Sequence, residues 1–173
     1  MATEIIATEN LSLRSPLASD LEILHERIFS DAQVMRFVFG GVPLTARQTS
    51  EFFASALDHD ATGLKLGVLV EKDSSEVAGF SGLIECSALN EKDYEIGFVL
   101  ARSFWGKGYA TEIGRGQLDY GFSKVGCDRL LAQVAPANTR SINVLKKIGM
   151  VLHSTNVTEG RGLRQIYIAF NAE

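Results

Sequence analysis

The chain has 173 residues, 46% of them hydrophobic and 22% charged, a size and composition that predict a single domain over residues 1–173. Seventeen Lys and Arg against 21 Asp and Glu give a net charge of −4, which argues against a nucleic-acid partner. Because no apolar run approaches the roughly 20 residues of a membrane span and the N-terminus lacks a secretion signal, we expect a cytoplasmic protein with no membrane partner.

The first part of the chain predicts a strand followed by two helices. Leu11 and Leu13 are separated by one polar residue, which is the period-two pattern of a strand. Ser19 or Asp20 can cap a first helix, and Thr45 can cap a second. The segment GVPL separates these two helices as a loop.

Three strand-like segments follow, at residues 64–70, 76–84 and 93–101. The first two flank a polar connector, EKDSSE, of hairpin length. We therefore expect the three strands to pair antiparallel, each beside the next.

Residues 107–125 change to a period of 3.6, which predicts a helix lying on the sheet. Gly114, Gly116 and Gly121 fall within it, and each costs about 1 kcal/mol relative to Ala. A close approach of the helix backbone to the sheet would offset that cost.

The last part of the chain predicts a strand, a short helix and a final strand. RLLAQVA reads as a buried strand, and RQIYIAF ends the fold as another. Between them, Asn138 or Thr139 can cap a helix that ends at Gly149.

The stretch FWGKGYATE, residues 104–112, has the composition of an anion-binding loop at a helix start. It does not fit a P-loop, because Lys107 is followed by Gly108. It fits a Rossmann fingerprint poorly, because Thr111 replaces the third glycine and the strands before it look antiparallel. A glycine-rich turn without a ligand is the structural alternative.

The cysteines and histidines do not form a metal-binding pattern. Cys86 and Cys127 stand alone, and His25, His59 and His153 are scattered. We expect both cysteines to be packing residues and expect no metal.

Two quoted segments carry a resemblance to a known family. YEIGFVLARSFWGKGYATEIGRGQLDYGF and RLLAQVAPANTRSINVLKKIGM resemble the core of the GNAT acyltransferase superfamily, in the branch of the ribosomal-protein-alanine N-acetyltransferases. The resemblance implies a mixed α/β fold, with a mostly antiparallel sheet of six to seven strands, splayed in the middle and flanked by about four helices. It also implies acetyl-CoA as cosubstrate.

The family's cofactor-binding positions carry over to this sequence by motif. The resemblance implies that Phe98, Val99 and Leu100 line the pantetheine arm, and that Asn138 meets the arm from the far side. Asn143 and Lys146 would lie nearer the nucleotide. The pyrophosphate would be bound by the loop residues Trp105, Gly106, Lys107, Gly108, Tyr109, Ala110 and Thr111.

Two residues are candidates for the chemistry, in which an amine attacks the thioester directly. Ser141 would donate a proton to the leaving thiolate, or it is an ordinary serine of a first helical turn. Glu95 would take a proton from the amine, directly or through water, or it is a solvated strand residue or a charge partner. The expected acceptor is a small amine or a protein N-terminus, and the chain would be a monomer or a homodimer. The alternative function is a non-catalytic acyl-CoA-binding module.

Overall fold

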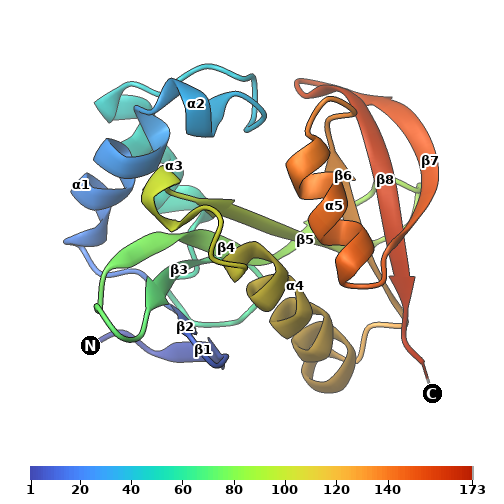
Figure 1. Cartoon of the computed structure of the whole chain (residues 1–173), viewed down its shortest axis with the longest axis horizontal. Helices are drawn as coiled ribbons and strands as arrows, with labels where there is room; N and C mark the ends of the chain where they lie inside the picture. The colour runs from blue at the N-terminus through green and yellow to red at the C-terminus, as the bar shows by residue number, and fades with distance from the viewer. Residues whose placement is uncertain (173) are drawn as a thin grey trace.

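One eight-stranded sheet organises residues 1–172, the part of the chain that the structure, a computed structural model, describes. Its strand order is β1-β2-β3-β4-β5-β6-β8-β7. Figure 1 shows the sheet running through the molecule between two sets of helices. The strands are β1 Glu4–Ala7, β2 Leu11–Arg14, β3 Leu66–Glu71, β4 Val77–Cys86, β5 Asp93–Leu100, β6 Arg129–Val134, β7 Val151–Thr158 and β8 Gly162–Phe170.

The helices cover both faces of this sheet. Their bounds are α1 Asp20–Leu24, α2 Ala32–Met35, α3 Ala46–Ala56, α4 Tyr109–Tyr120 and α5 Thr139–Lys147. Helices α1 and α4 continue as π-helical turns, His25–Phe29 and Gly121–Val125. The first three helices pack on β3 and β4 through one core that includes Phe29, Val68 and Phe80. Leu118 of α4 and Leu145 of α5 pack on the other face.

The mixed α/β class and the antiparallel β3-β4-β5 meander are confirmed. In the described part of the chain, the sheet has eight strands rather than six or seven, and five α-helices are present rather than about four. The sequence prediction missed β1 and β7. Strand β1 has only four residues, and β7 lies at the sheet edge with mostly exposed side chains, so neither shows a clear alternation.

The sheet is splayed between β5 and β6, as predicted. These neighbours are parallel, and the only pair between them among residues 1–172 joins Glu95 to Leu131. Strand β5 pairs with β4 along its whole length, and β6 pairs with β8 along its own. Within the described residues, the β6-facing edge of β5 therefore has no strand partner beyond Glu95.

Helix α4 begins two residues later than predicted. Gly106 and Gly108 adopt left-handed φ angles of +77° and +79°, which continue the loop up to Tyr109. The predicted close approach is confirmed at Gly121, where a Cβ atom would lie 2.5 Å from Leu130 Cδ1 of β6. Gly114 instead faces Ile148, beyond the end of α5.

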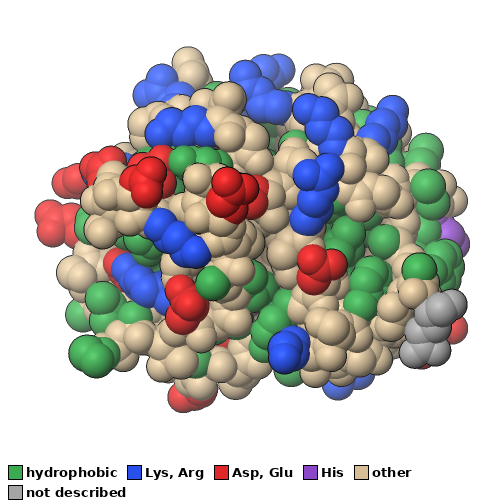
Figure 2. Space-filling view, turned by 60° about the horizontal axis from the view of Figure 1, so that its bottom comes forward, with side chains coloured by type: hydrophobic (Ala, Val, Ile, Leu, Met, Phe, Trp, Pro, Cys, Tyr) green, Lys and Arg blue, Asp and Glu red, His purple; other side chains and the backbone are tan. Residues whose placement is uncertain are grey.

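The molecular surface carries both signs of charge. On the face drawn in Figure 2, acidic and basic side chains lie among one another, in keeping with the small net charge of −4. No helix among residues 1–172 has the length and apolar character needed to cross a membrane.

Candidate active site

The splay between β5 and β6 opens a cleft of about 480 Å³, which we call the β5–α5 cleft. Strand β5 forms one wall, the start of α5 forms another, and α2 with the segment after it forms the third side. Several residues predicted for cofactor binding and catalysis meet here: Phe98, Val99, Leu100, Trp105, Ala110, Asn138 and Ser141.

The open edge of β5 gives this cleft its binding capacity. Backbone N–H and C=O groups of an unpaired strand edge can pair with an extended ligand as another strand would. The pantetheine arm of acetyl-CoA, with its two amide groups, is such a ligand, so the cleft fits the predicted cosubstrate. Trp105 lies at the end of this edge, where its Nε1–H donates to the Leu100 carbonyl over 2.8 Å. The Arg140 guanidinium lies 4.5 Å from the centre of the Trp105 ring and adds a cation to the cleft.

The glycine loop leads from this cleft into α4. A Cβ atom at Gly106 or Gly108 would meet nothing within 4 Å, so the loop backbone is open to approach by a ligand. The amides that follow begin α4 and carry the partial positive charge of a helix N-terminus. The loop geometry therefore suits a diphosphate.

The positive charge of Lys107 in this loop is balanced by the carboxylate of Glu71. Its Nζ lies 3.0 Å from Glu71 Oε1, and the Tyr109 hydroxyl donates to the same oxygen over 2.6 Å. Hydrogen bonds from Ser74, Tyr109 and Lys107 lower the pKa of Glu71 to about 2, so the carboxylate stays ionised. The part of Lys107 in anion binding stays a prediction.

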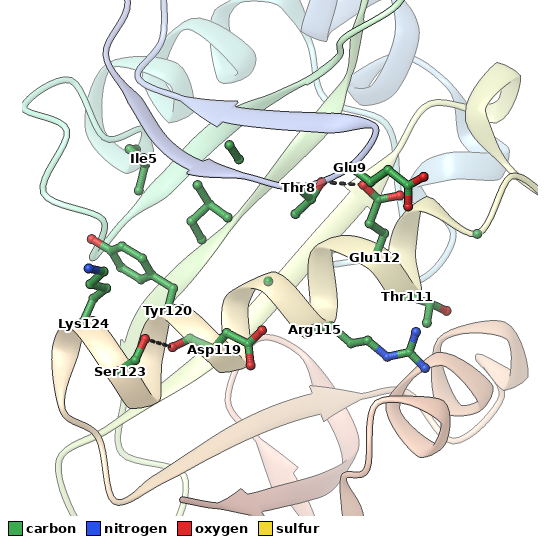
Figure 3. Close-up of a pocket in the computed structure, with 14 residues that line it drawn as sticks. Ile5, Thr8, Glu9, Thr111, Glu112, Arg115, Asp119, Tyr120, Ser123 and Lys124 are labelled. Carbon is green, nitrogen blue, oxygen red and sulfur yellow. Dashed lines mark hydrogen bonds between the residues drawn. The ribbon is translucent and has the colours of Figure 1, made fainter.

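The other predicted residues lie outside the β5–α5 cleft. Asn143 and Lys146 are exposed on α5. Gly108 and Thr111 instead line a cavity of about 600 Å³ on the β1 side of α4, which shares no lining residue with the cleft (Figure 3). The expected contacts of these residues with the nucleotide stay predictions.

Glu112 anchors the first turn of α4 to the β1–β2 turn. Its carboxylate accepts hydrogen bonds from the Thr8 hydroxyl over 2.5 Å and from the Asn10 backbone N–H over 2.7 Å, and Figure 3 shows the former. Burial raises the pKa of Glu112, but its hydrogen bonds with Thr8 and Asn10 outweigh burial, so the pKa is lowered overall. The sequence analysis quoted this residue within a motif without giving it a role.

A second, smaller space adjoins the cleft. This Glu95 cavity has a volume of about 140 Å³ and is lined by Glu95, Gln133, Arg161 and Arg164 among others. Both spaces share four residues that the sequence analysis named, which are Phe98, Val99, Asn138 and Ser141. The two spaces therefore meet at the start of α5.

Glu95 is buried in this cavity and held by two neighbours. Its Oε1 lies 3.3 Å from Nη1 of Arg161, and its Oε2 accepts a hydrogen bond from the Gln133 amide. Its side chain is opposite to that of Ile96, which packs in the core with α4 and α5. Glu95 thus lies where an acceptor could reach it, and it is also the charge partner of Arg161.

Asn138 caps α5, as predicted. Its Oδ1 accepts a hydrogen bond from the Ser141 backbone N–H over 3.2 Å. This cap fixes the first turn of the helix and with it the position of Ser141 between the two spaces. The proposed contact of Asn138 with the pantetheine arm and the acid role of Ser141 stay predictions.

The sequence analysis did not find Gln133, Arg161 and Arg164. Gln133 lies within a segment read only as a buried strand. The two arginines come from the β7–β8 hairpin, where β7 was missed and no local pattern shows that the hairpin turns back toward Glu95.

Neither cysteine has the character of a reactive thiolate. Burial raises the pKa of Cys86 to about 11, and burial also raises that of Cys127. Among residues 1–172, no group of three or more His, Cys, Asp and Glu side chains is arranged to hold a metal ion.

Residues 10–151 match the family model described as an acetyltransferase (GNAT) domain. The chain is a GNAT acetyltransferase. It is 33% identical to YkkB of Bacillus subtilis (strain 168) over 146 residues, covering 84% of each chain. It is also 32% identical to the N-acetyltransferase p20 of Bacillus licheniformis over 148 residues, covering 84% of this chain and 81% of p20.

Solved structures share the fold of this GNAT acetyltransferase. A GNAT-family acetyltransferase from Bacillus anthracis matches with a TM-score of 0.81 and 26% identity, covering 98% of both chains. RimL, a ribosomal α-N-protein acetyltransferase in complex with coenzyme A, matches with a TM-score of 0.78 and 16% identity, covering 97% of this chain and 98% of RimL. The spermidine N-acetyltransferase of Vibrio cholerae, in complex with CoA and spermine, matches with a TM-score of 0.74 and 18% identity. The match covers 93% of this chain and 95% of the Vibrio cholerae chain.

Proposed function

We propose that this GNAT acetyltransferase transfers an acetyl group from acetyl-CoA to a primary amine by direct attack on the thioester. The observation that carries the proposal is the junction of the β5–α5 cleft with the Glu95 cavity at Val99 and Ser141. A thioester at the end of an arm lying along β5 would meet an amine in the Glu95 cavity there. Two solved structures of the same fold contain CoA, which supports acetyl-CoA as the cosubstrate.

In the proposed reaction, the amine nitrogen forms a bond to the acetyl carbonyl carbon and the carbon–sulfur bond breaks. Glu95 receives the proton that the amine loses, directly or through water, or only orients the acceptor. Ser141 gives a proton to the departing thiolate and regains one from solvent water, which restores its hydroxyl. The backbone N–H near Val99 stabilises the oxyanion, and it costs little to reorganise because β5 already fixes it.

The arm, diphosphate and nucleotide contacts are part of the same proposal. Leu100 and Phe98 would line the arm with Asn138 across from them. The loop Trp105–Thr111 would bind the diphosphate through its amides, and Asn143 and Lys146 would lie near the nucleotide.

Release of free thiol tests the proposal. Purified chain is mixed with acetyl-CoA and a pooled panel of amines, and thiol is followed against a control without amine. We expect amine-dependent release at a rate proportional to enzyme. Binding of acetyl-CoA with no amine-dependent release would contradict the enzyme reading and favour a non-catalytic acyl-CoA-binding module.

A further inference from the structure

Three buried polar atoms without a hydrogen-bond partner gather in one place. Among the side chains of residues 1–172, these atoms are Gln133 Oε1, Arg161 Nε and Arg164 Nε. All three residues line the Glu95 cavity. Buried polar atoms are almost always paired in folded proteins, and one left unpaired costs about 1–3 kcal/mol. A ligand with matching donors and acceptors would recover that cost.

The cavity also contains more positive than negative charge. Arg161 forms an ion pair with Glu95, in which Nη1 lies 3.3 Å from Oε1. Arg164 is only 4% exposed and forms no ion pair with any residue of 1–172. Its hydrogen bond runs from Nη2 to the Phe39 carbonyl over 3.4 Å. Burial and the nearby charge of Arg161 lower the pKa of Arg164, and the charge of Glu95 only partly opposes them.

These observations identify the class of acceptor, and the inference rests on the proposed function. We propose that the acceptor is a small primary amine that carries a carboxylate, as an amino acid does. Arg164, with Arg161 beside it, binds the carboxylate, since a guanidinium matches a carboxylate with two parallel hydrogen bonds. Gln133 Oε1 accepts a hydrogen bond from the amine, which lies toward Val99.

The size and charge of the cavity favour this class over a polyamine. Its 140 Å³ is well below the roughly 300–1,000 Å³ of sites for larger ligands. A polyamine such as spermidine would bring further positive charge toward Arg161 and Arg164, and like charges repel in a buried site. A compact amine that carries a carboxylate fits both the small volume and the positive charge of the cavity.

The test compares acids with their neutral amides. Glycine, β-alanine and L-alanine are paired with glycinamide, β-alaninamide and L-alaninamide, and spermidine is added as a polycation. For each, kcat/KM is measured at saturating acetyl-CoA. The carboxylate of the acid holds its amine protonated to a higher pH than the amide does, so a preference for acids runs against the supply of neutral amine.

Three variants accompany the wild type. Arg164→Met removes the charge and keeps an apolar side chain of similar length, and Arg164→Lys keeps the charge without the planar fork. Arg47→Met is the matched control, because Arg47 is exposed on α3 and lies outside the cavity. Thermal melting establishes that each variant folds.

We expect the wild type and Arg47→Met to favour the acids over the amides by tenfold or more. In Arg164→Met this ratio should fall toward one, mainly through KM, and Arg164→Lys should lie between. Equal use of acids and amides, a preference for spermidine, or an unchanged ratio in folded Arg164→Met would overturn the inference while the proposed function stands.

A binding measurement decides the question even without turnover. With saturating CoA, N-acetylglycine should raise the Tm of the wild type more than N-acetylglycinamide does, and Arg164→Met should lose that difference. Equal shifts for the two compounds in the wild type would overturn the inference. Failure of the proposed function would be seen separately, as the absence of thiol release with every amine.

Discussion

Glu95 and Ser141 have different partners in the site. Glu95 is buried within the Glu95 cavity and contacts Arg161 and Gln133. Ser141 borders both spaces and is positioned by the Asn138 cap. A group on the acceptor side and a group on the thioester side should respond differently when substituted, because they serve opposite ends of the transfer.

Two substitutions at the residue scale separate these roles. Ser141→Ala should lower kcat about 100-fold with nearly unchanged affinity for acetyl-CoA, since it removes an interaction that matters mainly in the transition state. Glu95→Gln should reduce the rate most at low pH and with high-pKa amines. Raising the pH should restore much of that rate, because the amine then loses its proton unaided. The measurement is kcat/KM against pH for both variants and the wild type.

The pKa of the acceptor amine determines how much the reaction rate depends on Glu95 as a base. An α-amino group with a reference pKa of about 7.7–8.0 is roughly one-tenth neutral at pH 7, whereas an amine near 10.4 is neutral in under about one molecule in a thousand. A pH profile of Glu95→Gln parallel to that of the wild type would remove Glu95 from proton transfer. Its role would then be to hold Arg161 and orient the acceptor.

At the scale of elements, the site depends on where β5 stops pairing and where α4 starts. Strand β5 loses its β6 partner after Glu95, and α4 begins only after two left-handed glycines. Glu112 holds the first turn of that helix against the β1–β2 turn through Thr8 and Asn10. The loop between strand and helix is thus fixed at both ends, and a Cβ atom at Gly106 or Gly108 would meet nothing within 4 Å.

Gly108→Asp tests whether a diphosphate lies in that loop. The substitution adds a side chain and a negative charge, so affinity for CoA should fall more than tenfold, about 1.4 kcal/mol. Gly126→Asp is a matched control, because Gly126 has nearly the same φ, +78° against +79°, and also has no atom within 4 Å of a Cβ. It lies beyond the far end of α4, and its CoA affinity should be unchanged. Titration calorimetry measures both, and equal CoA affinities in the two folded variants would locate the diphosphate elsewhere.

The sequence predicted elements well where a local pattern specified them. Thr45 caps α3 with a capping box that includes Gln48, and the three meander strands were found as strand-like segments, the first two on either side of the polar connector EKDSSE. Strand β7 was missed because the apolar residues of this exposed edge strand, Val151, Leu152 and Val157, do not alternate with its polar ones. The start of α4 was placed too early, since periodicity does not reveal the left-handed φ of Gly108.

At the scale of the whole molecule, the candidate site joins segments far apart in the chain. Glu95 of β5 and Arg161 of the β7–β8 hairpin are 66 residues apart, yet they form an ion pair. The order β5-β6-β8-β7 brings them together, and that order depends on long-range pairing rather than on local pattern. This is why motif reasoning found the cleft residues such as Val99 and Trp105 but not the arginines that favour an anionic acceptor.

The stability of the folded chain with acetyl-CoA tests the central claim most directly. Both the open edge of β5 and the loop before α4 would contact one ligand, and neither exists in the unfolded chain. A ligand that binds only the native state at 100 times its Kd stabilises that state by about 2.7 kcal/mol. Melting curves over a range of acetyl-CoA concentrations should therefore show a Tm that rises steadily with ligand. A Tm unchanged at millimolar acetyl-CoA would contradict the account.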